Sequence, residues 1–249
     1  TGQIMVVIVT GTPIFPGSKN FVTALRKQCP EITTVIQNIN PQKTSMILGE
    51  RDKVLYGKGY IEDELLGLTF RLSPASFYQV NAKMTEKLYE TALSFANLSA
   101  NDTVLDAYCG VGTIGMAASR SAGQVIGVEL NKAAVRDAIA NAKRNGIENI
   151  RFFADDASDF LLRVAESGEK LDAVIMDPPR SGSTERFLES DCKVKPKRIV
   201  YVSCNPETLA RDLQLLKRWN YHCERLVPID NFPLTEHIES VVLLTKVHN

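Results

Sequence analysis

The chain has 249 residues, 44% of them apolar, and its 29 lysines and arginines balance 29 aspartates and glutamates. This composition fits one large domain, or one with a small companion, and excludes an overall electrostatic attraction to nucleic acid, so RNA binding would need a local patch. No apolar run reaches the roughly 20 residues that span a bilayer, and no secretory leader pattern opens the chain. We therefore expect a cytoplasmic protein without a membrane span.

The cysteines are odd in number and scattered, without any C-x-x-C spacing, at Cys29, Cys109, Cys192, Cys204 and Cys223. Such a pattern predicts neither a disulfide framework nor a metal site. The chain opens at Thr1 rather than at Met, directly in a β-rich pattern. We therefore expect a fragment of a longer protein.

The first 72 residues predict a small α+β companion subdomain. A β-rich run over 3–9, a helical pattern over 18–29 and a β-branched run over 32–39 give a β-α-β start. Short strand candidates between glycines and charged residues then favour a small antiparallel arrangement, at 46–48, 53–56, 60–65 and 68–72. Ser73-Pro74 interrupts this pattern, so we place the domain boundary between residues 72 and 73.

Strand and helix patterns alternate over 73–249. After a helix at 82–97, strands are predicted at 103–107, 124–129, 150–154, 171–176, 198–203, 220–229 and 238–246, and helices at 113–119, 131–144, 156–165, 184–191 and 206–217. This alternation predicts a Rossmann-like α/β domain whose parallel sheet is flanked by helices. No helix separates the last two strands, so they join as a hairpin and one strand at that end runs antiparallel. Ligands of such sheets bind beyond the carboxyl ends of the strands.

A glycine-rich loop follows the strand at 103–107, with Gly110, Gly112 and Gly115 before a helical pattern. Such a turn leaves backbone N–H groups free at a helix N-terminus and lets a nucleoside-bearing ligand approach the main chain, although alone it is as often a packing device. The next strand ends in Glu129, about 20 residues past Gly110, where ribose-binding folds place a carboxylate for the sugar hydroxyls. Together these features favour a nucleoside cofactor.

Two later segments carry candidate reactive groups. Asp177-Pro178-Pro179-Arg180 follows a buried strand, and its prolines make a rigid loop where the sheet opens, which favours a functional loop over a plain surface turn. Cys204 falls between a strand and a helix that Asn205 caps and Pro206 begins. We expect the helix dipole to lower the pKa of this thiol below its usual value of about 8.5 and so to make it a nucleophile.

Glu239 lies inside an apolar strand pattern near the end of the chain. Burial of a carboxylate costs several kcal/mol unless the group is paired or neutral, so a raised pKa suited to a proton acceptor is one interpretation. An edge position that faces water is the other.

Five segments, in one order along the chain, carry a resemblance to a known family: Phe77-Tyr78-Gln79-Val80-Asn81, Asp106-Ala107-Tyr108-Cys109-Gly110-Val111-Gly112, Asp177-Pro178-Pro179-Arg180, Ser203-Cys204-Asn205-Pro206 and Phe232-Pro233-Leu234-Thr235-Glu236-His237-Ile238-Glu239. They resemble the motifs of bacterial RNA uracil-5-methyltransferases, especially the branch that acts on 23S ribosomal RNA. The resemblance covers about residues 70 to 246 strongly and the first 70 more loosely. It implies a class I methyltransferase sheet, S-adenosylmethionine as cofactor and RNA as partner, and we expect a monomer.

The resemblance also implies roles for individual residues. Cys204 takes the place of the nucleophile and Glu239 that of the base, and cofactor contacts fall to Gln79, Tyr108, Thr113, Glu129, Asp156 and Asp177. Uracil C5 is a poor nucleophile, so a thiolate that adds at C6 generates an enolate that attacks the methyl group, after which the base removes the C5 proton. Arg180 could stabilise the enolate oxygen, and an aromatic side chain could hold the splayed-out base, at Phe77, Tyr78 or Phe232.

Two features that accompany this family are not visible in the sequence: an N-terminal RNA-binding β-barrel and a cysteine cluster for an iron–sulfur centre. Three alternatives stay open. The substrate could be a uridine of transfer RNA; the Asp-Pro-Pro-Arg loop could bind an exocyclic amine, as in amino-group methyltransferases that need no cysteine; or the chain could be an inactive RNA-binding module. The presence of both Cys204 and Glu239 argues against the last.

Overall fold

The computed structural model describes residues 1–42 and 47–246. The chain divides into two compact units, Thr1–Ser76 and Phe77–Asn249. The sequence places the boundary a few residues earlier, after residue 72. The candidate site belongs entirely to the second unit.

The first unit contains a three-stranded sheet in the order β1-β2-β3, made by β1 (Ile4–Thr10), β2 (Ile32–Ile39) and β3 (Arg51–Tyr56). β1 and β2 run parallel and are joined by α1 (Ser18–Gln28), which confirms the β-α-β start, and β3 runs antiparallel to β2. A separate antiparallel hairpin follows, formed by β4 (Ile61–Leu65) and β5 (Leu68–Leu72).

The predicted strand at 46–48 is wrong for Ile47 and Leu48, which lie outside any strand, while Met46 lies outside the described residues. Asparagine side chains take the backbone groups that a strand partner would otherwise bind. Asn40 Nδ2 donates to the Ile47 carbonyl at 3.1 Å, and Asn38 exchanges hydrogen bonds with both the N–H and the carbonyl of Gly49.

The second unit opens with helix α2 (Ala82–Ala96) and is built around a seven-stranded sheet in the order β11-β12-β10-β9-β6-β7-β8. The strands are β6 (Thr103–Ala107), β7 (Gln124–Glu129), β8 (Ile150–Ala154), β9 (Ala173–Met176), β10 (Arg198–Ser203), β11 (Tyr221–Ile229) and β12 (Glu239–Lys246). The helices between them are α3 (Thr113–Ala118), α4 (Lys132–Arg144), α5 (Ala157–Ser167), α6 (Glu185–Val194) and α7 (Pro206–Arg218).

Five strands, β8, β7, β6, β9 and β10, run parallel, and β12 runs antiparallel to both of its neighbours. The predicted α/β domain and the predicted antiparallel strand are therefore confirmed. The chain proceeds outward from β6 to β8 on one side and then returns to β9 on the other side of β6. Ligands of open α/β sheets bind where the strand order reverses in this way, so the carboxyl ends of β6 and β9 mark the expected position of a site.

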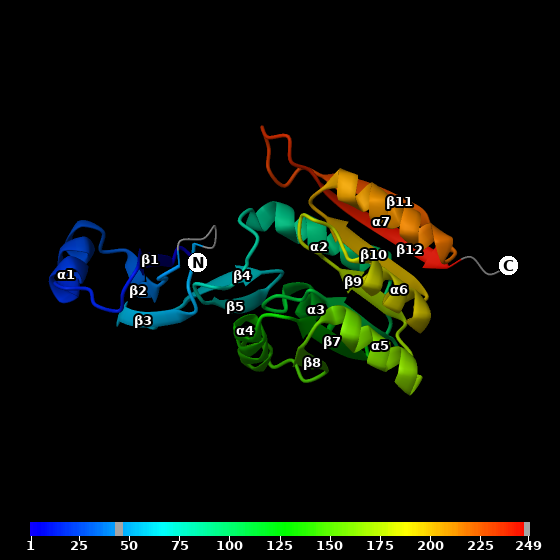
Figure 1. Cartoon of the computed structure of the whole chain (residues 1–249), viewed down its shortest axis with the longest axis horizontal. Coiled ribbons are helices and arrows are strands. Elements are labelled where there is room, and N and C mark those ends of the chain that lie inside the picture. Colours follow the sequence, from blue (N-terminus) through cyan, green and yellow to red (C-terminus); the bar gives the residue numbers. More distant parts are fainter. Residues whose placement is uncertain (43–46, 247–249) are drawn as a thin grey trace. The chain divides into compact units, whose positions relative to one another are not determined.

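Helices cover both faces of this sheet (Figure 1). α5, α6 and α7 follow one another along one face and enclose a core that includes Leu161, Phe187 and Leu216. α2, α3 and α4 pack on the other face. Because the parallel strands are covered on both sides, β9 and β10 are almost entirely buried, which accounts for their continuous apolar sequence patterns.

Candidate active site at the carboxyl ends of the strands

The glycine loop after β6 is fixed to the strand by a buried acid. Asp106, only 1% exposed, accepts a hydrogen bond at 2.7 Å from the N–H of Gly115 in α3. A Cβ at Gly115 would lie 2.7 Å from the same carboxylate oxygen, so this approach needs glycine. The pKa of Asp106 is raised to about 7, mainly by burial. The nearby charge of Glu129 also raises it, while the hydrogen bond from Gly115 lowers it.

Glu129, at the end of β7, closes onto this loop. One carboxylate oxygen accepts from the Gly110 N–H at 3.1 Å, and the other accepts from the Asn131 N–H at 2.8 Å. Gly110 itself has a φ of 54°. The sequence prediction that the second strand ends in an acid beside the glycine loop therefore matches the geometry.

A cavity of about 40 Å³ lies beside the loop and is lined in part by the segment 77–79. Of the six residues expected to contact a cofactor, four line it: Gln79, Tyr108, Thr113 and Asp177. A volume of this size holds one or two water molecules, whereas drug-sized ligands occupy about 300 Å³ or more. A nucleoside would therefore need the lining segments to move apart.

Neighbouring side chains hold three of these lining residues. The Thr113 hydroxyl lies 3.2 Å from the hydroxyl of Tyr89 in α2, and Asn231 Nδ2 donates to Gln79 Oε1 at 3.5 Å. Tyr108 takes a left-handed backbone conformation with a φ of 63°, and its hydroxyl lies 3.2 Å from Ser183 Oγ. Its ring packs against Phe187 with the ring centres 5.2 Å apart.

Asp156, the other expected cofactor contact besides Glu129, is outside the residues that line this cavity. It is the N-cap of α5, and its Oδ1 accepts from the N–H groups of Ser158 at 2.9 Å and Asp159 at 3.1 Å. One carboxylate oxygen is therefore engaged in capping the helix.

The register of two neighbouring strands brings Cys204 and Glu239 together. β10 and β12 are antiparallel, and Ser203 pairs with Ser240 at the end of the ladder. The next residues along are Cys204 on one strand and Glu239 on the other, and opposite positions of an antiparallel pair lie on the same side of a sheet. β12 is an interior strand and Glu239 is 3% exposed, which excludes the alternative of a water-facing edge position.

Electrostatics link Cys204, Glu239 and Asp177. Burial, the nearby Glu239 carboxylate and Asp106 raise the pKa of Asp177 to about 8, and burial raises the pKa of Glu239. The pKa of the Cys204 thiol is also raised, by burial first and then by the charges of Glu239 and Asp177, although Arg180 opposes this. The prediction that this pKa is lowered is therefore wrong, because partial burial and two carboxylates outweigh the opposing contributions of Arg180 and a backbone hydrogen bond.

Arg180 extends from the Asp-Pro-Pro-Arg loop, and its Nη2 lies 3.2 Å from His237 Nδ1. The two residues come from segments far apart in the sequence, one after β9 and one just before β12. A guanidinium at this place supplies positive charge near Cys204 in a site otherwise rich in carboxylates.

Several residues of the site have no sequence signal of their own. Tyr89 is a buried position on an amphipathic helix, and Asp212 sits in the middle of α7, yet both hydrogen-bond to groups of the site. Within 1–42 and 47–246 no cluster of three or more His, Cys, Asp and Glu residues could hold a metal ion, and no helix there is long and apolar enough to cross a membrane.

Comparison with known proteins gives a match to one family. Residues 37–247 match the family model described as tRNA (Uracil-5-)-methyltransferase. The chain is 46% identical to an uncharacterized RNA methyltransferase of Enterococcus faecalis over 99% of its own length and 54% of the relative's. It is 43% identical to another from Oceanobacillus iheyensis over 98% of its length and 53% of that relative's.

A solved structure agrees with this match. The crystal structure of a Pyrococcus abyssi tRNA (uracil-54, C5)-methyltransferase in complex with S-adenosyl-L-homocysteine superposes with a TM-score of 0.79 at 30% identity. The superposition covers 98% of this chain and 56% of that one. The chain thus spans about half the length of the relatives it matches.

Proposed function

The chain belongs to the tRNA (uracil-5-)-methyltransferase family, and from this premise we propose that it transfers a methyl group from S-adenosylmethionine to C5 of a uridine in RNA. The observation that carries the proposal is the position of Cys204 opposite Glu239, with Asp177 close to both. A thiol and a carboxyl with a raised pKa, side by side beyond the strand ends, are the pair that uracil C5 chemistry requires.

The residues present fit the proposed cofactor. Glu129 at the end of β7 is at the position where related folds bind ribose hydroxyls, and each of its oxygens keeps a lone pair beside its backbone hydrogen bond. Gln79, Tyr108, Thr113 and Asp177 line the adjacent cavity. When bound, the cofactor supplies an electrophilic methyl group on a positively charged sulfur.

Cys204 carries the covalent step of the proposed mechanism. The thiol first loses its proton to solvent, and the thiolate Sγ then forms a bond to C6 of the uracil while the electron pair of the C5–C6 double bond moves toward O4, which gives an enolate. C5 of this enolate would then take the methyl group, whose bond to the sulfur of the bound cofactor would break and leave its electron pair on that sulfur. Burial and the charges of Glu239 and Asp177 raise the pKa of the thiol, and a positively charged cofactor beside Asp177 would offset the contribution of the two carboxylates, so more of the thiol would be ionised with the cofactor bound.

Glu239 completes the reaction by taking the proton from C5, which restores the C5–C6 double bond and expels the Cys204 thiolate. A carboxyl that burial makes more basic than usual is a better proton acceptor than an exposed one. Arg180, held next to His237, is placed to stabilise the developing charge on the enolate oxygen.

The substrate is proposed at two levels. RNA follows from the family, and 23S ribosomal RNA is our first candidate because the five sequence motifs resemble that branch. Transfer RNA is the second candidate, favoured by the name of the matching family and by the Pyrococcus abyssi structure. Methylation assays with the two purified RNAs, followed by nucleoside analysis for 5-methyluridine, separate these candidates.

A trapping experiment tests the mechanism. Fluorine at C5 cannot leave as a proton does, so RNA containing 5-fluorouridine, incubated with the protein and S-adenosylmethionine, should form a stable adduct that peptide mapping by mass spectrometry places on Cys204. A folded protein that methylates uridine without forming this adduct would contradict the covalent mechanism. Methylation of an exocyclic amine would instead support the amino-group alternative.

A further inference from the structure

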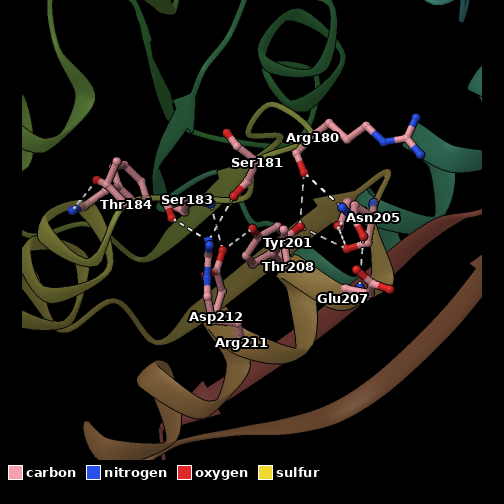
Figure 2. A network of polar contacts seen from close by, with 12 residues as sticks. Arg180, Ser181, Ser183, Thr184, Tyr201, Asn205, Glu207, Thr208, Arg211 and Asp212 are labelled. Atoms are coloured by element: carbon pink, nitrogen blue, oxygen red, sulfur yellow. Dashed lines mark hydrogen bonds and ion pairs between the residues drawn. The ribbon is translucent and has the colours of Figure 1, made fainter.

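A buried carboxylate on α7 connects the loop after β9 with strand β10. Asp212 is fully buried, and its Oδ2 accepts hydrogen bonds from the Ser183 N–H at 2.8 Å and from the Tyr201 hydroxyl at 2.7 Å (Figure 2). Its Oδ1 accepts from Arg211 Nε at 2.8 Å. One carboxylate therefore holds loop 177–184, β10 and α7 at a single point.

Arg211 extends this attachment along the loop. Its Nη2 donates to the carbonyls of Ser181 and Ser183, both at 3.1 Å. Gly182 lies between them with a φ of 77°, and a Cβ there would lie 2.5 Å from Arg211 Nη2 and 2.8 Å from Asp212 Oδ2. The loop can approach the pair this closely only because residue 182 is glycine.

The first turn of α7 holds the same loop at a second point. The Arg180 carbonyl accepts from Asn205 Nδ2 and Thr208 Oγ1, both at 3.3 Å, while the Arg180 side chain points away from this network (Figure 2). Asn205 also caps α7 through the Glu207 N–H at 3.0 Å, and it directly follows Cys204. The segment that bears Asp177 and the turn that bears Cys204 are therefore joined by side-chain hydrogen bonds.

The network reaches both halves of the candidate site. On one side Ser183 Oγ meets the hydroxyl of Tyr108, which lines the cavity beside the glycine loop. On the other side Tyr201 lies on the strand that leads to Cys204. We propose that Arg211 and Asp212 are positioning residues that set the distance between the cofactor at Tyr108 and the nucleophile at Cys204.

This inference rests on the proposed function, because it matters only if a methyl group and a thiol must meet one substrate at the same time. The physical reason is geometric: a displacement of about 1 Å between reacting groups can lower a rate roughly 100-fold while binding changes little. Neither residue needs to touch a substrate for this effect.

Arg211→Gln is the informative variant, because the Arg211 side chain is about half exposed and its replacement leaves the core intact, whereas Asp212→Asn alters a buried group. We expect kcat for RNA methylation to fall roughly 10- to 100-fold, with KM for S-adenosylmethionine and for RNA nearly unchanged. Arg211→Lys, which keeps one donor and the charge, should recover part of kcat. Arg136→Gln, at an exposed arginine of α4, is the matched control and should leave kcat unchanged.

The outcomes are separable. A folded Arg211→Gln protein with the wild-type kcat overturns the inference, and so does a rise in KM for RNA alone, which would mark a contact with phosphate. If the wild type itself methylates no RNA, the proposed function fails, and alkylation of Cys204 by iodoacetamide then decides the inference without RNA or turnover. In Arg211→Gln the loop is released, and the ratio of Cys204 alkylation to Cys223 alkylation in the same sample should rise severalfold. A ratio equal to that of the wild type would reject the positioning role.

Discussion

The site has two halves, one around the glycine loop and one built by β9, β10 and β12, and their carboxylates differ in the hydrogen-bond donors they meet. All of these carboxylates lie at strand ends of one sheet. In the glycine-loop half, Asp106 and Glu129 accept hydrogen bonds from backbone N–H groups. In the half built by β9, β10 and β12, no residue in the described part of the chain donates a hydrogen bond to the side chains of Asp177 and Glu239. Burial raises the pKa of both, as it does that of Asp106, so the two halves differ in their hydrogen-bond donors.

From this difference we infer that the glycine-loop half binds the cofactor and that the other half takes part in proton transfer. Backbone hydrogen bonds hold a carboxylate in place, which suits the recognition of hydroxyl groups, and they oppose the rise in pKa that burial causes, as the Gly115 N–H does at Asp106. A carboxyl that is buried without such donors stays more basic, which suits the acceptance of a proton. We therefore expect substitutions in the glycine-loop half to weaken cofactor binding and substitutions in the other half to slow the chemistry.

The largest effect should come from Cys204→Ala, which removes the covalent step. We expect methyl transfer to fall at least about 10⁴-fold, because the loss of a covalent nucleophile removes a whole reaction path. The measurement is transfer of a radiolabelled methyl group to RNA. The control is Cys223→Ala, at an exposed cysteine on β11, which should keep wild-type activity. Activity that survives in Cys204→Ala would point to the amino-group alternative.

Glu239→Gln should leave the first step intact and block the last one. We expect turnover to fall about 10²- to 10⁴-fold and a methylated covalent complex with ordinary RNA to accumulate, because no group removes the C5 proton. The complex should be visible as a shifted band in denaturing electrophoresis. Glu236→Gln, at an exposed acid of the same turn, is the control. A Glu239→Gln protein that turns over normally would assign the base elsewhere.

Glu129→Gln tests the other half of the comparison. The amide cannot hold the Gly110 and Asn131 N–H groups as a carboxylate does, so we expect the Kd for S-adenosylhomocysteine to rise about 30-fold, which corresponds to about 2 kcal/mol. Isothermal titration calorimetry measures this change, with Glu148→Gln as an exposed control. Formation of the Cys204 adduct at saturating cofactor should stay normal, and its loss would erase the distinction between the halves.

The last prediction concerns Asp191, a carboxyl on α6 whose pKa burial alone raises to about 8. Within the described residues neither of its oxygens has a hydrogen-bond partner. The folded protein keeps this proton up to about pH 8, whereas an unfolded aspartate loses it near pH 4, so the free energy of unfolding falls as pH rises through that window.

Asp191→Asn removes this titration. We expect the variant to match the wild type in urea unfolding near pH 4 and to be more stable by a few kcal/mol at pH 9, because each unit of pKa shift corresponds to about 1.4 kcal/mol. Equal stability of the two proteins at both pH values would show that burial without a hydrogen-bond donor does not raise the pKa of Asp191.

The sequence patterns predict the sheet closely because its strands are short, apolar and bounded by polar turns. The strands at 103–107, 124–129, 150–154 and 198–203 match their predicted bounds, since their apolar or β-rich runs end where charged or turn-forming residues begin. The failure at Ile47 and Leu48 has a local cause. Side chains of asparagines at earlier positions bind that backbone, and hydropathy does not register such bonds.

The site was predictable as a set of strand ends but not in its electrostatics. Parallel alternation alone implies that Asp106, Glu129 and Asp177 converge. The raised pKa of Cys204 depends on burial first and then on Glu239 and Asp177, and all three arise only through the fold, so a rule based on its own helix gave the wrong direction. Asp212 resembles any helical acid in the sequence, because its partners come from a loop and a neighbouring strand.

The antiparallel course of β12 has a mechanical consequence. A strand that runs against its neighbours delivers its opening residue, rather than its closing one, to the rim where catalysis is proposed, and here that residue is Glu239. Because Glu239 pairs with Ile229 of β11, the strand ladder fixes the position of the acid, and the length of the turn over 230–238 does not. Insertions or deletions in that turn would therefore leave the base where the sheet holds it and would displace only the residues between the two strands.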